Sequence, residues 1–276
     1  MVMACHREPL RIGKRRYAHD ECTIERLIGK YWDAFDALAE LADTISRLKA
    51  GEAFDLEFTI DEQPTEVAAF DCLTTTEELL FVLREIRRRG LPVTHVAPNF
   101  GQEKGWDYRC PDGLAGLEKR FREQMAISDA FGVMLDVHSA DDLARPVRQV
   151  IHRATGGRVH YKISPSLQLL FAETLADHDA RLFREWWEDA RAYARREAEA
   201  GSAFAVECLR ADGADDLAPS PRHMVFHHFS FAFVGRRDKA GRFMNRDRFY
   251  GLSDVFQRDY ARRIVDCLRG LAEDLF

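Results

Sequence analysis

Four histidines lie in apolar runs that are typical of β-strands. They are His138 in VMLDVHS, His160 in RVHYKI, and His227 and His228 in HMVFHHF. Neutral imidazole nitrogens bind zinc, manganese, nickel and iron, and carboxylates complete such sites. If the ends of these runs meet in the folded protein, the sequence predicts a site for a divalent metal ion.

The third run leaves one choice open. Successive side chains of a strand point to opposite faces, so at most one of His227 and His228 would bind the metal. The pattern does not decide between them, and we take His227 as the predicted ligand. A lone histidine of this kind is more often a core residue bonded to a backbone carbonyl, so the prediction depends on three runs that converge.

Carboxylates stand at two places where they could act beside such a metal. Asp61 and Glu62 close the alternating run EAFDLEFTID, and Asp107 lies in the segment PNFGQEKGWDY. A carboxylate near a metal in a desolvated pocket is suited to general acid–base catalysis. Each also has a purely structural interpretation, as an acid in the turn before Pro64 or as a surface-loop residue.

Basic and hydroxyl side chains near these positions could bind a substrate. Lys104 lies in the same glycine-containing loop as Asp107, and loops after strands often carry such contacts. Lys162 shares a strand face with His160 and could hold a carboxylate, although a solvated lysine at a strand end is equally expected. Ser139 lacks the GxSxG motif of a hydrolase nucleophile, which leaves it a candidate substrate contact.

The elements that must carry these residues alternate between two periods. Helices are expected at 23–49, 114–131 and 141–155, and in TTTEELLFVLREIRRRG, whose acidic start and arginine-rich end suit the helix dipole. Strands are expected at 52–61, 93–98, 133–138, 158–163, 203–208 and 224–233. This β–α alternation predicts parallel strands joined by right-handed crossovers.

Two architectures fit such alternation, an open doubly wound sheet and a barrel. No GxGxxG or GxxxxGK(S/T) motif follows any of the expected strands, so a dinucleotide or P-loop fold loses its main support. Polar residues end nearly every strand, and a barrel gathers strand ends at one rim, where its active site lies. We therefore predict one TIM-like (β/α) barrel domain over residues 1–276. Six strands are clear and a seventh is expected in PLRIGKR, which leaves open whether the barrel is complete.

The composition excludes several other classes of protein. The formal net charge of −6 and the isoelectric point near 6.0 give no basic surface for nucleic acid. No apolar run is long enough to span a membrane, and the basic start MVMACHREPLRIGKRR lacks the apolar core of a signal peptide. The six scattered cysteines form no CxxC pair and indicate reduced thiols in the cytoplasm.

Taken in order, several segments resemble one known family. LEFTIDEQPT, LREIRRRGLPVTHVAPNFGQEKGWDY, LEKRFREQMAISDAFGVMLDVHS and GGRVHYK resemble the tagaturonate epimerases, also described as hexuronate C4-epimerases. The resemblance is good over about residues 23–175 and weaker afterwards. It implies a barrel enzyme that uses a divalent metal to interconvert tagaturonate and fructuronate. The implied chemistry is retro-aldol cleavage of C3–C4, rotation of the aldehyde fragment and re-addition.

The resemblance also implies roles for individual residues. Glu62 would be an acid–base group, Asp107 a second one or a metal ligand, and His138 and His160 ligands. Lys104 and Lys162 would contact the substrate. The sequence departs from the family in reading VHSADDLAR and HYKISP at positions expected to touch substrate, and in starting without the family's large N-terminal portion.

Three functions therefore compete. The first is a metal-dependent epimerase or isomerase acting on a ketouronate or a related sugar acid. The second is a metal-dependent aldolase or lyase on another small carbohydrate, and the third is a non-catalytic relative that binds a sugar acid. The expected partner is a small-molecule sugar acid, or another small carbohydrate for the lyase, and a second copy of the chain would cover an open barrel edge.

Overall fold

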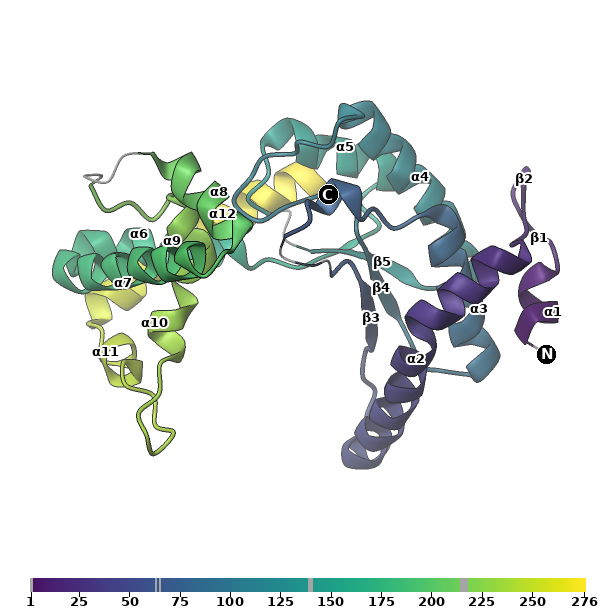
Figure 1. The fold of residues 1–276 in the computed structure, drawn as a ribbon, viewed down its shortest axis with the longest axis horizontal. Coiled ribbons are helices and arrows are strands. Elements are labelled where there is room, and N and C mark those ends of the chain that lie inside the picture. Colours follow the sequence, from purple (N-terminus) through teal and green to yellow (C-terminus); the bar gives the residue numbers. More distant parts are fainter. Residues whose placement is uncertain (1, 63, 65, 139–140, 214–217) are drawn as a thin grey trace.

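The computed structural model describes residues 2–62, 64, 66–138, 141–213 and 218–276. Figure 1 shows two parts, a parallel sheet with its helices and a purely helical part. The sheet has the order β3 (Glu57–Ile60), β4 (His95–Pro98), β5 (Met134–Val137) and β6 (His160–Tyr161). These four strands lie within predicted ranges, so the prediction of a parallel α/β sheet is confirmed.

Helices follow the first three strands and cover one face of the sheet (Figure 1). They are α3 (Thr76–Arg89), α4 (Gly113–Phe131) and α5 (Arg145–Thr155). The strands turn alternate side chains toward these helices, so that Phe58 and Ile60 are buried in the core while Thr59 between them is exposed. Helix α2 (Glu21–Lys49), which precedes the sheet, adds a stripe of buried residues that includes Ile24 and Phe35.

The sequence specifies the ends of these helices locally. Thr75 caps α3 by accepting a hydrogen bond from the Glu78 backbone, and Glu78 returns one to the Thr75 backbone, which forms a capping box. Gly90 ends the helix with φ of 67°, a conformation that glycine adopts without steric cost. Pro146 lies in the first turn of α5, where the missing N–H does no harm.

The other face of the sheet carries polar side chains, and no helix among the described residues covers it. Thr59 and His160 are exposed there, His95 is half-buried, and Met134 has 45% of its surface exposed. The four strands form an open sheet, and the described residues do not close it into a barrel. The segment PLRIGKR does form strands, β1 (Leu10–Ile12) and β2 (Arg15–Tyr17), but they make a separate antiparallel hairpin after helix α1 (Val2–Arg7).

The second half of the chain is helical. Its elements are α6 (Pro165–His178), α7 (Ala180–Glu199), α8 (Ala203–Asp212), α9 (Met224–Phe229), α10 (Phe231–Gly235), α11 (Arg246–Tyr250) and α12 (Asp254–Leu275). The strands predicted at 203–208 and 224–233 are therefore wrong. Short apolar runs do not distinguish a buried strand from a buried helix. Here Ser202 caps α8, and the carboxylate of Asp212 accepts from the first backbone N–H groups of α9.

Helix α12 connects the two parts. Phe256 near its start is buried in the helical core around Trp186, whereas Leu271 and Leu275 near its end are buried in the core beneath the sheet. Asp274 also accepts hydrogen bonds from Arg145 and Arg148 of α5. No helix in the described part of the chain is both long and apolar enough to cross a membrane.

Candidate active site

A cavity of about 560 Å³ lies at the carboxyl ends of the strands, between the sheet and the helical part. The strand ends contribute Asp61, Asn99 and His138 to its wall. Further polar and aromatic wall comes from three places: the segment after β3, with Glu62, Glu66, Phe70 and Asp71; the segment after β4, with Gln102, Glu103, Lys104, Trp106 and Arg109; and the helices, with Phe204, Glu207 and His228. The volume and the mixed lining suit a small polar ligand such as a sugar acid.

The buried side chain of His138 lies among three carboxylates. Its Nδ1 lies 3.0 Å from Asp61 Oδ2, and its Nε2 lies 3.1 Å from Glu57 Oε2 and 3.8 Å from Asp136 Oδ2. Burial alone would lower the pKa of His138, but the hydrogen bonds with Asp136, Asp61 and Glu57 outweigh it and raise the pKa to about 10. A protonated ring would donate from both nitrogens, so His138 would have to lose a proton and one of these contacts to bind a metal.

A second histidine continues this cluster along the polar face. His160 Nδ1 lies 2.6 Å from Asp136 Oδ2, and one ligand atom each of Glu57, Asp136 and His160 lie within 4.8 Å of one another. The other oxygen of Asp136 is buried and has no hydrogen-bond partner among the residues that the structure describes. Two carboxylates and an imidazole are suitable ligands for a divalent cation, so this donor set fits the metal that the sequence predicts.

The two-residue period of the strands explains this convergence. Glu57 and Asp61 are separated by four positions, and Asp136 and His138 by two, so each pair occupies one face. Asp136 and His160 are paired across the parallel strands β5 and β6. All five side chains therefore come to the same face of the sheet.

The segment after β4 brings two cations to the cavity in different surroundings. The Nζ of Lys104 donates to Gln168 Oε1 at 2.7 Å, and burial lowers the pKa of this lysine. Arg109 instead lies between Glu103 and Glu207, and its guanidinium stacks 4.4 Å above the ring of Trp106. Arg109 thereby ties this segment to α8.

Four of the candidate residues from the sequence reach the cavity wall, namely Asp61, Glu62, Lys104 and His138. His160 joins the cluster next to it through Asp136. Lys162 is exposed after β6, where its backbone N–H donates to Val137, and its side chain is not part of the wall that the described residues form. Ser139 lies outside the described residues.

Asp107 and His227 have other surroundings. The exposed Asp107 accepts hydrogen bonds from the backbone N–H groups of Tyr108 and Ala144. His227 is buried in α9 against Gly105, and burial lowers its pKa to about 4. Within the described ranges no hydrogen bond or ring contact joins His227 to the other predicted ligands. Its neighbour His228 does reach the cavity wall.

Several site residues were not predicted. Glu57 and Asp136 could have been found from the two-residue period, because they share a face with Asp61 and His138. Arg109 follows the predicted substrate loop by one residue. Phe204 and Glu207 lie in a segment that was mistaken for a strand, so their position beside the cavity could not be inferred.

Comparison with known proteins identifies the family. A family model described as tagaturonate epimerase (UxaE) matches residues 5–266. The chain belongs to the tagaturonate epimerase family. The expected resemblance is thereby confirmed, and it extends over the helical part as well as the sheet.

Individual relatives agree with this assignment. The tagaturonate/fructuronate epimerase of Thermotoga maritima is 31% identical over 156 residues, which are 55% of this chain and 30% of that protein. The native crystal structure of fructuronate-tagaturonate epimerase UxaE from Cohnella laeviribosi superposes with a TM-score of 0.76 at 21% identity, covering 99% of this chain and 56% of the other. A complex of the same enzyme with two glycerol molecules gives a TM-score of 0.74. The chain thus has the fold of the Cohnella laeviribosi enzyme and spans about half of its length.

Proposed function

We propose that this protein is a divalent-metal-dependent epimerase that inverts C4 of a ketouronate of the tagaturonate and fructuronate type. The observation that carries the proposal is the cavity at the strand ends, where Glu62, the Asp61–His138 pair and Lys104 face one space. Membership of the family supports the reaction class, and the acidic and basic groups support a sugar acid as substrate.

The metal would be held by Glu57, Asp136 and His160. The close approach of their ligand atoms and the unpartnered oxygen of Asp136 support this choice. His138 is the alternative ligand that the sequence predicts, and it connects this cluster to the cavity through Asp61. A divalent ion bound there would supply Lewis-acid assistance at a ketone oxygen of the substrate.

The chain's own groups account for binding and proton transfer. Lys104 would pair with the substrate carboxylate, which orients the sugar acid in the cavity. Glu62 would take the proton of the C4 hydroxyl as the C3–C4 bond breaks, and would return it after the aldehyde fragment has rotated and the bond has re-formed. The contacts favour Asp61 over Asp107 as a second acid–base group, because Asp61 lines the cavity and Asp107 serves backbone amides.

The test is a conversion assay with tagaturonate and fructuronate, followed by proton NMR. The protein is first treated with a chelator and then supplied with manganese, zinc, nickel or iron, and its metal content is measured by elemental analysis. We expect about one metal ion per chain and interconversion only after metal is returned. We expect Asp136→Asn to lower the metal content, and Glu62→Gln to keep the metal but to lose about 10²- to 10⁴-fold in kcat.

Asp43→Asn and Glu52→Gln are the matched controls, because both side chains are exposed and outside the site. If cleavage products accumulate without re-addition, the protein is a lyase and not an epimerase. If the sugar acid binds without any turnover, the protein is a non-catalytic relative.

Self-association and a cytoplasmic location also stay predictions. The open polar face of the sheet supports the first. The second rests on the cysteines, all six of which are free.

A further inference from the structure

We propose that Gln168 and His228, both from the helical part, are positioning residues that present Lys104 to the cavity as a cation without a carboxylate partner. In this way the helical part would make the site select substrates that carry a carboxylate. This inference rests on the proposed function, because it names the substrate group that the same cavity distinguishes.

The side chain of Lys104 is held by a neutral amide. Its Nζ donates to Gln168 Oε1 at 2.7 Å. On its other side the amide of Gln168 donates from Nε2 to Ser230 Oγ at 2.6 Å. A lysine ammonium can only donate, so the bond to Ser230 keeps the amide oxygen of Gln168 turned toward Lys104.

The backbone of Lys104 is fixed by the same part of the molecule. His228 Nε2 lies 3.0 Å from the Lys104 carbonyl oxygen, and its ring packs edge-on against Phe204 with centroids 4.8 Å apart. Gln168 lies on α6, His228 on α9 and Phe204 on α8. Three helices that lie far from Lys104 in sequence therefore determine where this cation lies.

The charges around Lys104 leave it available for an anionic ligand. Asp141 and Asp142 attract its ammonium group, but Asp141 accepts from the Ser166 backbone N–H and Asp142 from that of Gly105. Among the residues that the structure describes, no carboxylate forms an ion pair with Lys104. Arg109 in the same cavity is paired with two, Glu103 and Glu207.

A neutral partner matters for specificity. If a carboxylate replaced the amide, it would neutralise the ammonium group and compete with the carboxylate of the substrate. A neutral sugar does not use this contact, so its binding should not depend on which of the two groups is present. Changing Gln168 to glutamate alters one atom and the charge with nearly the same shape.

The experiment compares Gln168→Glu with the wild type, using fructuronate and the neutral sugar fructose as probes in calorimetric titrations. We expect Gln168→Glu to weaken fructuronate binding by about tenfold or more and to leave fructose binding unchanged. In turnover, KM should rise about tenfold while kcat changes by less than about twofold. Gln257→Glu makes the same chemical change on the exposed surface of α12, and it should alter neither the binding of the two sugars nor the turnover.

A second pair of variants tests His228. His228→Gln keeps an N–H donor for the Lys104 carbonyl and should bind fructuronate nearly as well as the wild type, whereas His228→Ala should bind it more weakly. The proposal would be overturned if the wild type and Gln168→Glu bound fructuronate with equal affinity. It would also be overturned if Gln168→Glu lost the same affinity for fructuronate and for fructose.

The binding measurements separate this inference from the proposed function. If the protein prefers fructuronate and Gln168→Glu loses that preference, the inference holds even when no epimerisation is found. If epimerisation is found and the preference persists in Gln168→Glu, the proposed function holds and the inference fails.

Discussion

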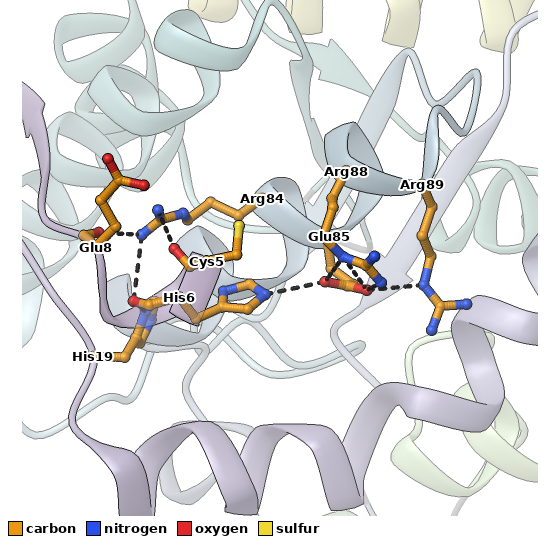
Figure 2. A network of polar contacts seen from close by, with 8 residues as sticks. All are labelled: Cys5, His6, Glu8, His19, Arg84, Glu85, Arg88 and Arg89. Carbon is orange, nitrogen blue, oxygen red and sulfur yellow. Dashed lines mark hydrogen bonds and ion pairs between the residues drawn. The ribbon is translucent and has the colours of Figure 1, made fainter. Parts of the chain in front are cut away.

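Glu85 is a fully buried carboxylate of α3 that takes charged or polar partners from several directions (Figure 2). Its Oε2 lies 3.0 Å from His6 Nε2, and its two oxygens also accept from the Nε atoms of Arg88 and Arg89. A buried carboxylate is stable only when such partners offset the loss of hydration. The site of Glu85 is therefore a structural ion cluster, separate from the cavity.

The cluster predicts how stability depends on pH. Burial alone would raise the pKa of Glu85, but the hydrogen bonds from Arg88, His6 and Arg89 outweigh it and lower the pKa to about 2 from its usual 4.5. A lowered pKa in the folded state stabilises the protein fully above about pH 4.5, and this contribution is lost as the pH falls toward 2. The shift corresponds to about 3 kcal/mol in the free energy of unfolding.

The measurement is urea unfolding of the wild type and Glu85→Gln between pH 7 and 3. The difference in the free energy of unfolding should be largest at pH 7 and should shrink below pH 4.5, because glutamine does not titrate. Glu40→Gln on the exposed surface of α2 is the control and should give a small difference at every pH. If the difference in the free energy of unfolding between the wild type and Glu85→Gln does not change with pH, the folded state does not stabilise the charge of Glu85.

For individual residues, the sequence indicated which side chains lie at the cavity better than it indicated which side chains they contact. His138, Glu62 and Lys104 were identified because each lies at or just after the end of a true strand. The two-residue period places the carboxylates around His138 on one face of their strands, but the strand pairing that brings Glu57 and Asp61 next to His138 has no local signal in the sequence. The contact of Lys104 with Gln168 depends on a helix 64 residues later, and no local pattern could indicate it.

Among the elements, α1 is held to α3 by the side chain of Arg84 as well as by the contact between His6 and Glu85. The guanidinium group of Arg84 donates to the backbone carbonyls of Cys5, His6 and Glu8, which lie at the end of this short helix (Figure 2). These carbonyls have no partner within the helix, and a positive charge there also suits the helix dipole. Arg84 therefore serves as a C-terminal cap supplied by another element.

We expect Arg84→Met to release α1 while leaving the sheet intact. A helix of six residues is not stable alone, so its amide hydrogens should exchange much faster once the cap is lost. Hydrogen exchange followed by mass spectrometry would measure this in residues 2–8. Arg87→Met is the control, because Arg87 contacts Ala130 and Phe131 of α4 instead. Unchanged protection of α1 in Arg84→Met would contradict the assigned role.

The type of an element could be predicted where the apolar period and the residues at the ends of the element agreed. Each of the first three strands of the sheet is followed by a helix with buried apolar residues, and α2 to α5 carry caps or stop residues at the ends of that pattern. The segments 203–208 and 224–233 carry only short apolar runs. Their helical state depends on burial between neighbouring helices and on caps such as Asp212, which lies twelve residues before the N–H group that it binds.

In the molecule as a whole, two hydrophobic cores share one helix. The predicted single domain requires that both cores unfold together, and α12 provides the connection because it is buried in both. We expect heat or urea to give one transition, with the same midpoint by circular dichroism and by the fluorescence of Trp186 and Trp187 in the helical core, measured in a variant in which Trp32 and Trp106 are replaced by phenylalanine.

The variant Leu271→Ala tests this coupling. It removes a buried side chain from the core beneath the sheet and should cost about 2–5 kcal/mol. The tryptophans of the other core should report the same loss. Val265→Ala, at an exposed position on the same helix, is the control. Two separate unfolding midpoints would show that the chain has two domains. A loss of stability that only one of the two probes reports would show the same.

The overall architecture was predicted only in part. The alternation of strands and helices ends after residue 161, and the prediction of a TIM-like barrel extended it across the helical half. Family membership was recognisable because it depends on ordered segments along the chain. Closure depends on strand pairing at the sheet edges, for which the sequence has no local signature.

The shared helix also has a consequence for protein synthesis. A ribosome makes the four strands and their helices long before it reaches Leu271 and Leu275, which complete the core beneath the sheet. Until these residues have left the exit tunnel, that core exposes the apolar surface that they will cover. The nascent sheet must therefore remain unfinished through the synthesis of more than a hundred residues, and it would be a natural client for a chaperone during that time.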